Sequence, residues 1–391
     1  MMNRLLRAFL LFAGILACCG CSQSPPPEST ALVGQISMNP GAGQGNLLLV
    51  HVTLNSKSYL FAVDTGTSVT TLDRALQSGL TTMPYKEAVN GAHSGIVAQA
   101  FEPPELMLDG QPLAFNHFVV SLDLSALRRI SGEPIMGILG MDVLSKCRLR
   151  LDFENNQISF LGPDEQVSTT GATALEIQSS TPYGLPSINF DFLNSKNASF
   201  IIDTGNVGAG IISPQLYTQV MQGGDAVPGE VIPAFTQKGT SLTHQVRFVR
   251  SIELAGVDHP GLIFASGSVN TLGLRFFASY VATFDFPGHE LYLVPIAPAA
   301  PSFDAYQSNM AIGLEDDKVM VLWVNPNGAA GEAGIKSGDQ IISVDGTLTA
   351  GRELWQIRKQ LHSPTPGTID VNIIRKNQPM QIVIKLKKIS A

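Results

Sequence analysis

Short apolar runs separated by turn residues dominate the chain. Gly and Pro are plentiful between the runs, and stretches with helical spacing are few. This pattern is typical of β-strands joined by tight turns. We expect Asp73 to cap a short helix through Leu76, and Ser213-Pro214 to begin another, because these residue types favour helix N-termini. The chain is therefore predicted to be mainly β with a few accessory helices.

A hairpin followed by Asp-Thr-Gly occurs twice. When Asp64 is laid on Asp203, an offset of 203 − 64 = 139, Leu54-Asn55-Ser56-Lys57 falls on Leu193-Asn194-Ser195-Lys196. Each copy reads as an apolar strand, an Asn-Ser turn, and a second apolar strand that delivers its aspartate to a tight turn. The repeat predicts two related halves.

A second pair of segments matches farther along the chain, at an offset of 272 − 139 = 133. Leu139-Gly140 falls on Leu272-Gly273, and Leu151-Asp152-Phe153 falls on Phe284-Asp285-Phe286. A loop easily absorbs the difference of 139 − 133 = 6 residues. The predicted body is therefore a duplicated β unit of roughly 130 residues. Its two lobes are expected over residues 33–165 and 170–297.

The start of the chain has the layout of an export signal. Arg4 and Arg7 precede an apolar run over residues 8–17. This run is well short of the roughly twenty residues that a membrane-spanning helix needs. We expect a signal peptide over residues 1–21 and a flexible, proline-rich tether over residues 22–32.

Three cysteines follow the apolar run, among them Cys18 and Cys21. This arrangement resembles the lipobox of bacterial lipoproteins. The resemblance implies cleavage before Cys21 or Cys18, with Cys21 favoured as the lipidated residue, and a periplasm-facing protein held to the membrane by a lipid. Because Ser22 and not aspartate follows Cys21, the outer membrane is favoured over the inner one. An ordinary secretory signal with incidental cysteines is the alternative.

Composition narrows the functional classes. The formal net charge is −7 and the sequence has no basic stripe, so nucleic acid is not an expected partner. The seven histidines lack metal-ligand spacing, and no metal or other cofactor is expected. No serine has the Gly-x-Ser-x-Gly setting of a serine hydrolase. Cys147, in apolar surroundings, is predicted to be a buried free thiol.

The repeated turns carry the candidate chemistry. Ala62-Val63-Asp64-Thr65-Gly66-Thr67-Ser68 and Ile201-Ile202-Asp203-Thr204-Gly205 resemble the active-site turns of pepsin-like and retropepsin-like aspartic proteases. Ile138-Leu139-Gly140 and Thr271-Leu272-Gly273 resemble the segments that pack beside each turn in that family. The resemblance implies a two-lobed β-barrel fold and an aspartic endopeptidase that hydrolyses extended peptide or protein substrates.

The catalytic pair implied by this resemblance is Asp64 and Asp203. Peptide hydrolysis needs an activated water and a proton donor. Two carboxylates about 3 Å apart cannot both ionise, so one serves as base and the other as acid. Six neighbours are expected to support the pair. The resemblance implies bonds across the lobes from Thr65 and Thr204, and Gly66 and Gly205 permit tight turns, while Thr67 and Asn206 occupy the position after each glycine.

Asn206 departs from the family pattern. A serine or threonine commonly follows the glycine and bonds its aspartate; Thr67 matches, whereas Asn206 is longer and has a different geometry. The alternative function is therefore a catalytically inactive peptide-binding or scaffolding lipoprotein that keeps the protease fold. The family also needs a hairpin flap, for which residues 90–95 and 238–241 are candidates.

Two charged residues follow the Leu-Gly steps. Asp142 and Arg275 could support the turns from behind, but a structural ion pair is the favoured interpretation of each.

The last ninety residues change in pattern. Residues 333–342, Ala-Gly-Ile-Lys-Ser-Gly-Asp-Gln-Ile-Ile, resemble part of a PDZ domain of the kind attached to bacterial envelope proteases. The resemblance implies a small α/β domain over residues 303–391, in which a C-terminal peptide adds as a strand beside Ile312-Gly313-Leu314. Residues 354–361 keep helical spacing and would form the groove helix or its core side. A groove that is empty or filled by the protein's own chain is the alternative.

Overall fold

The computed structural model describes residues 33–91, 95–115, 117–162, 165, 169–179, 184–236, 239–296 and 306–388. The predicted signal peptide, the tether and Cys21 lie outside the described residues. Within the described part of the chain, no helix has both the length and the apolar character needed to span a membrane.

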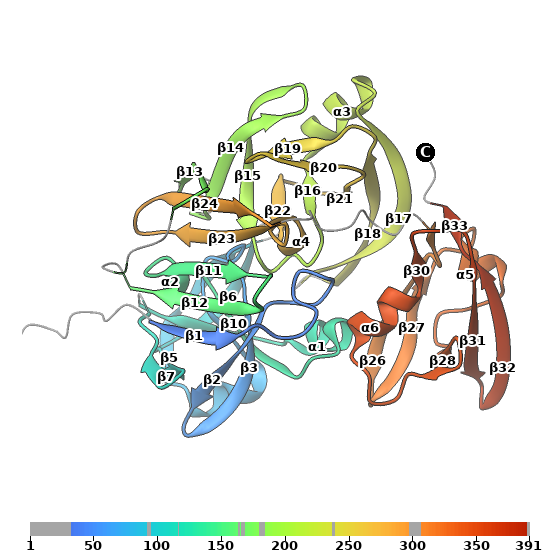
Figure 1. Cartoon of the computed structure of the whole chain (residues 1–391). Coiled ribbons are helices and arrows are strands. Elements are labelled where there is room, and N and C mark those ends of the chain that lie inside the picture. Colours follow the sequence, from blue (N-terminus) through green and yellow to red (C-terminus); the bar gives the residue numbers. More distant parts are fainter. Residues whose placement is uncertain are drawn as a thin grey trace, which may run out of the picture. The chain divides into compact units, whose positions relative to one another are not determined.

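The first lobe is built mainly from a nine-stranded sheet of order β5-β6-β9-β4-β10-β3-β2-β7-β8. Figure 1 shows its strands and short helices. The elements of this lobe are β1 (Gly34–Ser37), β2 (Leu49–Leu54), β3 (Lys57–Val63), β4 (Thr71–Asp73), a 3-10 helix (Arg74–Gly79), β5 (Thr82–Asn90), β6 (Gly95–Phe101), β7 (Leu106–Leu108), β8 (Gln111–Pro112), β9 (Val119–Leu122), α1 (Ser125–Ser131), β10 (Ile135–Leu139), α2 (Met141–Leu144), β11 (Arg148–Asp152) and β12 (Gln157–Leu161).

The second lobe supplies most of a thirteen-stranded sheet of order β1-β12-β11-β23-β24-β13-β14-β15-β22-β16-β21-β18-β17. Its elements are β13 (Thr173–Gln178), β14 (Ser187–Phe192), β15 (Ser195–Asp203), β16 (Gly210–Ile212), α3 (Pro214–Gln222), β17 (Ala226–Thr236), β18 (Gly239–Phe248), β19 (Ile252–Leu254), β20 (Val257–His259), β21 (Ile263–Ser266), β22 (Thr271–Gly273), α4 (Leu274–Phe277), β23 (Tyr280–Asp285) and β24 (Glu290–Pro295).

The two lobes share this sheet through antiparallel strands β11 and β23. Arg148 faces Asp285, and Asp152 faces Val281. At the repeat offset of 133, Arg148 is equivalent to Val281 and Asp152 is equivalent to Asp285. Exchanging the two lobes therefore exchanges these two residue pairs and leaves the pairing of the strands unchanged. The lobes are thus related by an approximate two-fold axis between these strands. Arg148 Nε also contacts Asp285 Oδ2 at 2.7 Å, an ion pair between the lobes.

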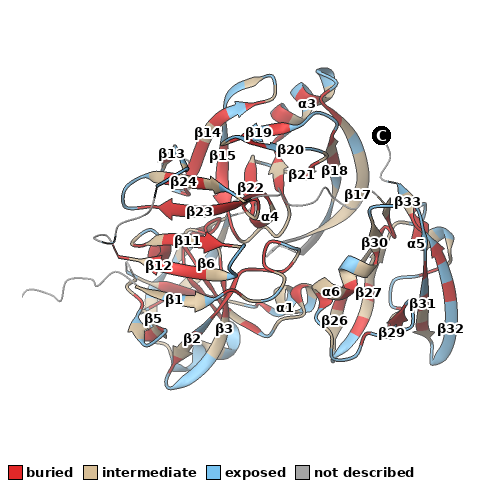
Figure 2. Cartoon of the chain, viewed as in Figure 1, coloured by how far each residue is buried: buried red, intermediate tan, exposed pale blue. Residues whose placement is uncertain are grey.

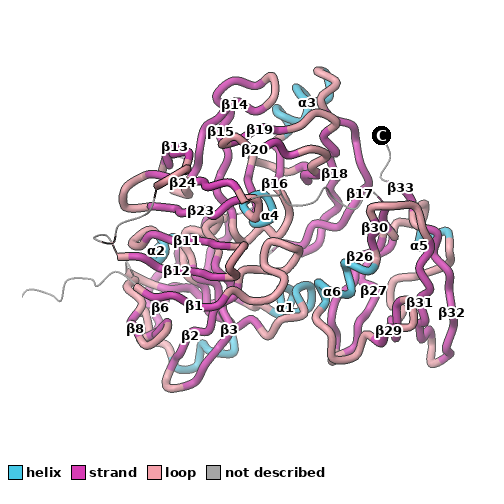
Figure 3. The backbone as a smooth tube through the Cα atoms, in the orientation of Figure 1, coloured by secondary structure: helices cyan, strands magenta, loops and turns pink. Residues whose placement is uncertain are grey.

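The C-terminal domain is a small sheet of order β26-β27-β28-β31-β32 with two helices and shorter strand pairs. Its elements are β25 (Tyr306–Gln307), β26 (Met310–Glu315), β27 (Lys318–Val324), α5 (Ala329–Glu332), β28 (Gln340–Val344), β29 (Thr347–Leu348), α6 (Leu354–Gln360), β30 (His362–Ser363), β31 (Thr368–Arg375), β32 (Gln378–Lys385) and β33 (Lys387–Lys388). Figure 3 shows how strands outweigh helices throughout.

One apolar core runs through both lobes, and the C-terminal domain has a separate one. Figure 2 shows buried residues along the strands of the shared sheet, where every residue of β23 is buried. In the second lobe Phe192 is fully buried and packs on Phe200 and Phe248, with ring centroids 4.9 and 5.4 Å away. Truncating such a ring to alanine costs about 3–5 kcal/mol.

Several local predictions can be compared with the structure. Ser213 caps α3 with Pro214 in its first turn, as predicted. Asp73 caps a 3-10 helix that runs beyond Leu76. Cys147 is a buried free cysteine, as predicted.

The second Asn-Ser turn was predicted one residue too late. In the first hairpin, Asn55 and Ser56 form the turn at φ 50° and 61°. In the second, the turn falls on Leu193 and Asn194. The pairing of β14 with β15 shifts before this turn because the Asp191 carboxylate accepts a hydrogen bond from Asn197 N and so holds a bulge.

Candidate active site

The two Asp-Thr-Gly turns lie against each other. Asp64 follows β3 and is half-buried, whereas Asp203 ends β15 and is buried. A Cβ atom on Gly66 would lie 2.4 Å from Asp203 Oδ1, and one on Gly205 would lie 2.4 Å from Asp64 Cγ. Each glycine therefore touches the carboxyl group of the opposite turn, which only a residue without a side chain can do. This contact brings the two carboxyl groups together from separate lobes.

The threonines beside the aspartates link the turns. Thr65 N donates to Thr204 Oγ1 and Thr204 N donates to Thr65 Oγ1, both at 3.1 Å. Each hydroxyl then donates to a carbonyl of the opposite strand at 2.8 Å, Thr65 Oγ1 to Ile202 O and Thr204 Oγ1 to Val63 O. Both threonines are fully buried. These four hydrogen bonds satisfy the amide and the hydroxyl of both threonines and tie the lobes at the aspartates.

Each turn is backed by the apolar-apolar-glycine segment expected from the sequence. Strand β10 runs parallel to β3, and β22 runs parallel to β15. A Cβ atom on Gly140 would lie 2.6 Å from the Val69 backbone, and one on Gly273 would lie 2.3 Å from Gly208 O. The glycines are therefore required for the chain after each turn to pack against its partner strand.

Thr67 and Asn206, the residues after the two turn glycines, form equivalent backbone hydrogen bonds, but their side chains have different roles. Thr67 O accepts from Met141 N at 2.9 Å, and Asn206 O accepts from Leu274 N at 2.8 Å. The Asn206 side chain also organises its own loop, since Oδ1 accepts from Gly208 N at 2.9 Å and Nδ2 lies 3.3 Å from Thr271 Oγ1. Asparagine thus stabilises the second turn through its loop and strand neighbours.

Asp142 supports the first turn from behind and forms no ion pair with any described residue, so the structural ion pair predicted for it is wrong. Its Oδ1 accepts from both the amide and the hydroxyl of Thr70, each at 2.8 Å, and Thr70 Oγ1 in turn accepts from Gly140 N at 3.1 Å. The other oxygen, Oδ2, is buried without a partner among the described residues. Burial raises the pKa of Asp142 to about 6, although the Thr70 bonds and Lys146 act in the opposite direction. The amide and hydroxyl of Thr70 thus bind the Asp142 carboxyl group in place of a cation.

A hairpin of the first lobe is anchored at its Asp-Thr-Gly turn. Strands β5 and β6 pair, and Asn90 at the end of β5 exchanges bonds with Ser68: Ser68 N donates to Asn90 O at 2.9 Å, and Asn90 N donates to Ser68 Oγ at 3.0 Å. Gly91 and Thr67 form an isolated antiparallel β-bridge. The tip at residues 92–94 lies outside the described residues, as do residues 237–238 at the tip of the β17–β18 hairpin.

A cavity of about 700 Å³ adjoins the second turn. Gly205 and Asn206 line it, as does the β17–β18 hairpin with residues such as Leu242, which is 62% exposed. The C-terminal part of α1 lines the cavity from the first lobe, and Arg358 of α6 lines it from the C-terminal domain. Its walls are mostly apolar with several hydroxyl groups.

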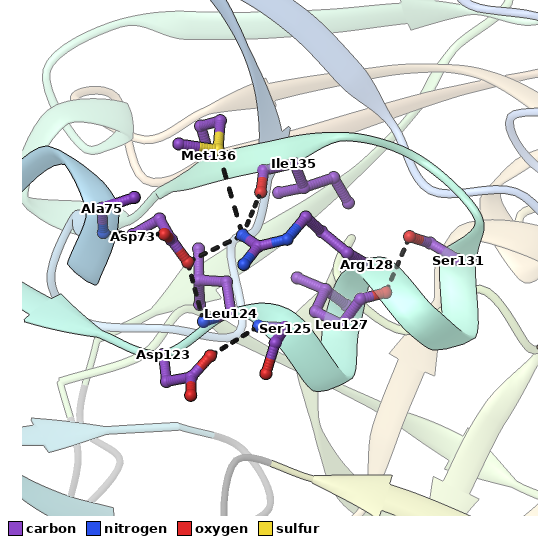
Figure 4. A network of polar contacts seen from close by, with 10 residues as sticks. All are labelled: Asp73, Ala75, Asp123, Leu124, Ser125, Leu127, Arg128, Ser131, Ile135 and Met136. Atoms are coloured by element: carbon purple, nitrogen blue, oxygen red, sulfur yellow. Dashed lines mark hydrogen bonds and ion pairs between the residues drawn. The ribbon is translucent and has the colours of Figure 1, made fainter. Parts of the chain in front are cut away.

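Helix α1 is held in place by Asp73, as Figure 4 shows. Arg128 Nη1 contacts Asp73 Oδ2 at 2.7 Å and donates to Ile135 O at 2.9 Å, while Asp73 also accepts from Leu124 N at 3.0 Å. Burial by itself would raise the pKa of Asp73, but bonds from Ala75 N, Arg128 and Leu124 N outweigh it and lower this pKa below its ordinary value.

The end of α1 covers the edge at which the sequence predicted peptide binding. Ile312-Gly313-Leu314 lies in β26, whose paired neighbour in the described sheet is β27. A Cβ atom on Gly313 would lie 2.7 Å from Arg129 O, and Arg129 also forms an ion pair with Glu315. A Cβ atom on Gly132 would lie 2.8 Å from Leu354 Cγ in α6. The chain's own helix therefore fills the space between β26 and α6.

Three comparisons with known proteins bear on this architecture. Residues 309–386 match the family model described as PDZ domain, so the C-terminal domain is a PDZ domain, as predicted. The search of curated proteins found no match. The fold class predicted from the sequence, a mainly β two-lobed body followed by a small PDZ domain, is confirmed.

Two solved structures illustrate the likeness. A photosystem II D1 C-terminal processing protease is similar at 22% identity over 23% of this chain, with a TM-score of 0.22; the chain spans about a quarter of that protease, 25%. The aspartic proteinase from Irpex lacteus is similar at 16% identity over 68% of this chain and 98% of its own, with a TM-score of 0.41. At these identities and TM-scores, neither likeness supports a statement about chemistry. The candidate chemistry rests on the geometry of the two Asp-Thr-Gly turns.

Sequence reasoning missed one residue that supports the first turn and two arginines that hold α1 or line the cavity. Thr70, which joins Asp142 to Gly140, lies in no motif, and Arg128 and Arg358 look like ordinary helix-surface cations. Their partners are far along the chain, so no local spacing signals them. The one local signal was Asp73, an N-cap residue whose second oxygen was free to bind Arg128.

Proposed function

We propose that the chain is an aspartic endopeptidase with Asp64 and Asp203 as its catalytic pair. The observation that carries the proposal is the mutual contact of the two turns, in which Gly66 and Gly205 each lie against the opposite carboxyl group. A structural loop has no need of two aspartates from different lobes at one point. Placing two carboxylates together costs free energy through their repulsion unless they share a proton, which is the arrangement that acid–base hydrolysis uses.

The mechanism follows from that shared proton. One carboxylate accepts a proton from a water molecule as the water attacks the peptide carbonyl, and the other donates its proton to the carbonyl oxygen. The proton taken from water then passes to the leaving nitrogen as the C–N bond breaks, and a hydroxyl of the tetrahedral intermediate returns its proton to the other carboxylate, so the pair again shares one proton. The buried Thr65–Thr204 bonds keep the carboxyl groups in register, because small misplacement of reacting groups is costly. The adjoining cavity receives the extended chain on one side of the pair.

The test is cleavage of a mixed peptide library by the full chain from acid to neutral pH. Asp64→Asn and Asp203→Asn should each abolish turnover while leaving the thermal unfolding midpoint nearly unchanged. Asp317→Asn, at an exposed turn of the PDZ domain, is the matched control and should keep full activity. Turnover that survives either dyad substitution would refute the proposed pair.

A second candidate function rests on Asn206. This residue replaces the usual hydroxyl residue and directs its amide toward Thr271 and Gly208. A chain that keeps the fold but binds peptides without cleaving them would show saturable peptide binding in the cavity and no products at any pH. Restoration of turnover by Asn206→Thr would identify that residue as the cause.

The other expected roles form part of the same proposal. Signal cleavage and lipidation at Cys21 would hold the enzyme at the bacterial envelope, facing the periplasm and favouring the outer membrane. Metabolic labelling with a fatty acid, lost in Cys21→Ser, tests the anchor. The PDZ domain presents protein substrates or binds a peptide C-terminus, and because the α1 end lies beside Gly313, such a peptide has to displace it.

A further inference from the structure

Arg358 is the only charged residue among the described residues that line the cavity. It lies on α6 of the PDZ domain, and the same cavity is also lined by Gly205 and Asn206 of the second Asp-Thr-Gly turn. The cavity therefore joins residues of the second Asp-Thr-Gly turn to a cation contributed by a different domain. Its remaining polar lining consists of uncharged groups, such as Ser131 and Thr243.

The hydrogen bonds of Arg358 leave its charge uncompensated. Its Nη2 donates to Ile130 O and to Ile312 O, which are both neutral carbonyls. No Asp or Glu in the described part of the chain forms an ion pair with it, whereas the neighbouring Arg129 is paired with Glu315. Burial lowers the pKa of Arg358 to about 10, so the guanidinium remains charged at neutral and acid pH.

The geometry leaves part of the guanidinium for a ligand. A guanidinium has five N–H donors in a planar fork, and the bonds to the protein all use Nη2. Nε and Nη1 have no acceptor among the described residues, and the side chain is half-buried where it borders the cavity. A planar group with two acceptor oxygens matches such a fork, and a carboxylate is the group of that kind that a peptide carries.

We propose that Arg358 is a specificity residue that binds a carboxylate of the peptide held in the cavity. This inference rests on the proposed protease function. The carboxylate is either an acidic side chain or the C-terminus of the substrate, and in both cases the PDZ domain takes part directly in substrate selection. Peptides that carry both apolar side chains and a carboxylate match a lining that is mostly apolar and contains Arg358.

The experiment compares peptide pairs of the same sequence. One pair differs by Glu against Gln at successive positions on each side of the scissile bond, and another by a free C-terminal carboxylate against an amide, which separates the two sources. For the full chain we expect kcat/KM to be about tenfold higher for the carboxylate member of one pair, the size of a single charge-assisted hydrogen bond. In Arg358→Gln that preference should vanish, and Arg358→Glu should favour Lys at the same position.

Arg129→Gln is the matched control. It removes a neighbouring cation that links α1 to the PDZ domain but does not line the cavity. If Arg129→Gln abolishes the preference equally, Arg358 acts only by positioning α1 and the inference is wrong. The inference also fails if wild-type protein cleaves the members of every pair equally well. In that case turnover of the neutral peptides still supports the protease function, so the two failures are distinguishable.

Discussion

Thr65 and Thr204 form one matched pair of hydrogen bonds across the two lobes, in which the amide of each donates to the hydroxyl of the other at 3.1 Å. Their sequence separation is 204 − 65 = 139, the repeat offset that aligns Asp64 with Asp203. The two halves of the chain thus meet at equivalent atoms, and the position of each aspartate depends on the other lobe. Predictions about these turns follow from that dependence.

Replacing Thr204 by valine should separate the effect of its hydroxyl from that of its volume. Thr204→Val leaves Val63 O and Thr65 N buried without their partners, and each such loss costs about 1–3 kcal/mol. We expect the free energy of unfolding in urea to fall by about 2–4 kcal/mol and turnover to fall with it. Thr204→Ser keeps the hydroxyl and should retain most of both. Equal behaviour of the two variants would contradict the role of these bonds.

Adding one methyl group at Gly66 should displace the opposite carboxyl group. The Cβ of Gly66→Ala would lie 2.4 Å from Asp203 Oδ1, so the turns have to move apart. A displacement of about 1 Å at reacting groups costs about a hundredfold in rate, and we expect peptide turnover to fall by at least that factor. Gly79→Ala, where nothing lies within 4 Å of the added Cβ, is the control and should be fully active.

Asp142 should make the protein less stable as the pH rises. Its pKa is about 6 in the folded chain against 3.8 for an ordinary aspartate, so the folded state binds more protons between these values. The contribution of Asp142 to the free energy of unfolding is fully present below about pH 4. It is lost as the pH rises through 6, which lowers the free energy of unfolding by about 3 kcal/mol. Asp142→Asn removes this titration. The difference in unfolding free energy between wild type and variant, measured from pH 4 to 7, should change by that amount, and a constant difference would count against it.

The contact between α1 and β26 can be followed with an intrinsic fluorophore. Trp355 of α6 packs on the first lobe, since a Cβ atom on Gly41 would lie 2.5 Å from its ring. Gly313→Val would press on Arg129 O and separate α1 from β26. In a Trp323→Phe background, we expect the Trp355 emission to shift to longer wavelength as its ring gains water.

The control for this experiment lies in the same domain. Gly367→Val meets nothing within 4 Å of its added Cβ and should leave the Trp355 emission unchanged. An emission spectrum of Gly313→Val that matches wild type would mean that the α1 contact does not hold the PDZ domain against the lobe.

Local patterns were sufficient to predict the elements at the centre of each lobe. The Asp-Thr-Gly turns and the Leu-Gly segments are contiguous in sequence, and alternation of apolar residues with turn residues specifies the strands beside them. The cap at Ser213 was predictable for the same reason, because a capping serine bonds an amide only three residues away. The second hairpin was predicted one residue off because the bulge held by Asp191 changes the register without changing the apolar pattern.

By itself, the sequence determined the class of the fold, the two related halves, the identity of the candidate dyad and the presence of a PDZ domain. Those features depend on short-range periodicity and on motifs that repeat. Only the tertiary structure decided that Asp142 binds Thr70, that α1 fills the space beside Gly313, and that Arg358 borders the cavity of the second turn. These contacts join residues from distant parts of the chain, and packing between elements, not spacing along the sequence, selects which side chains meet.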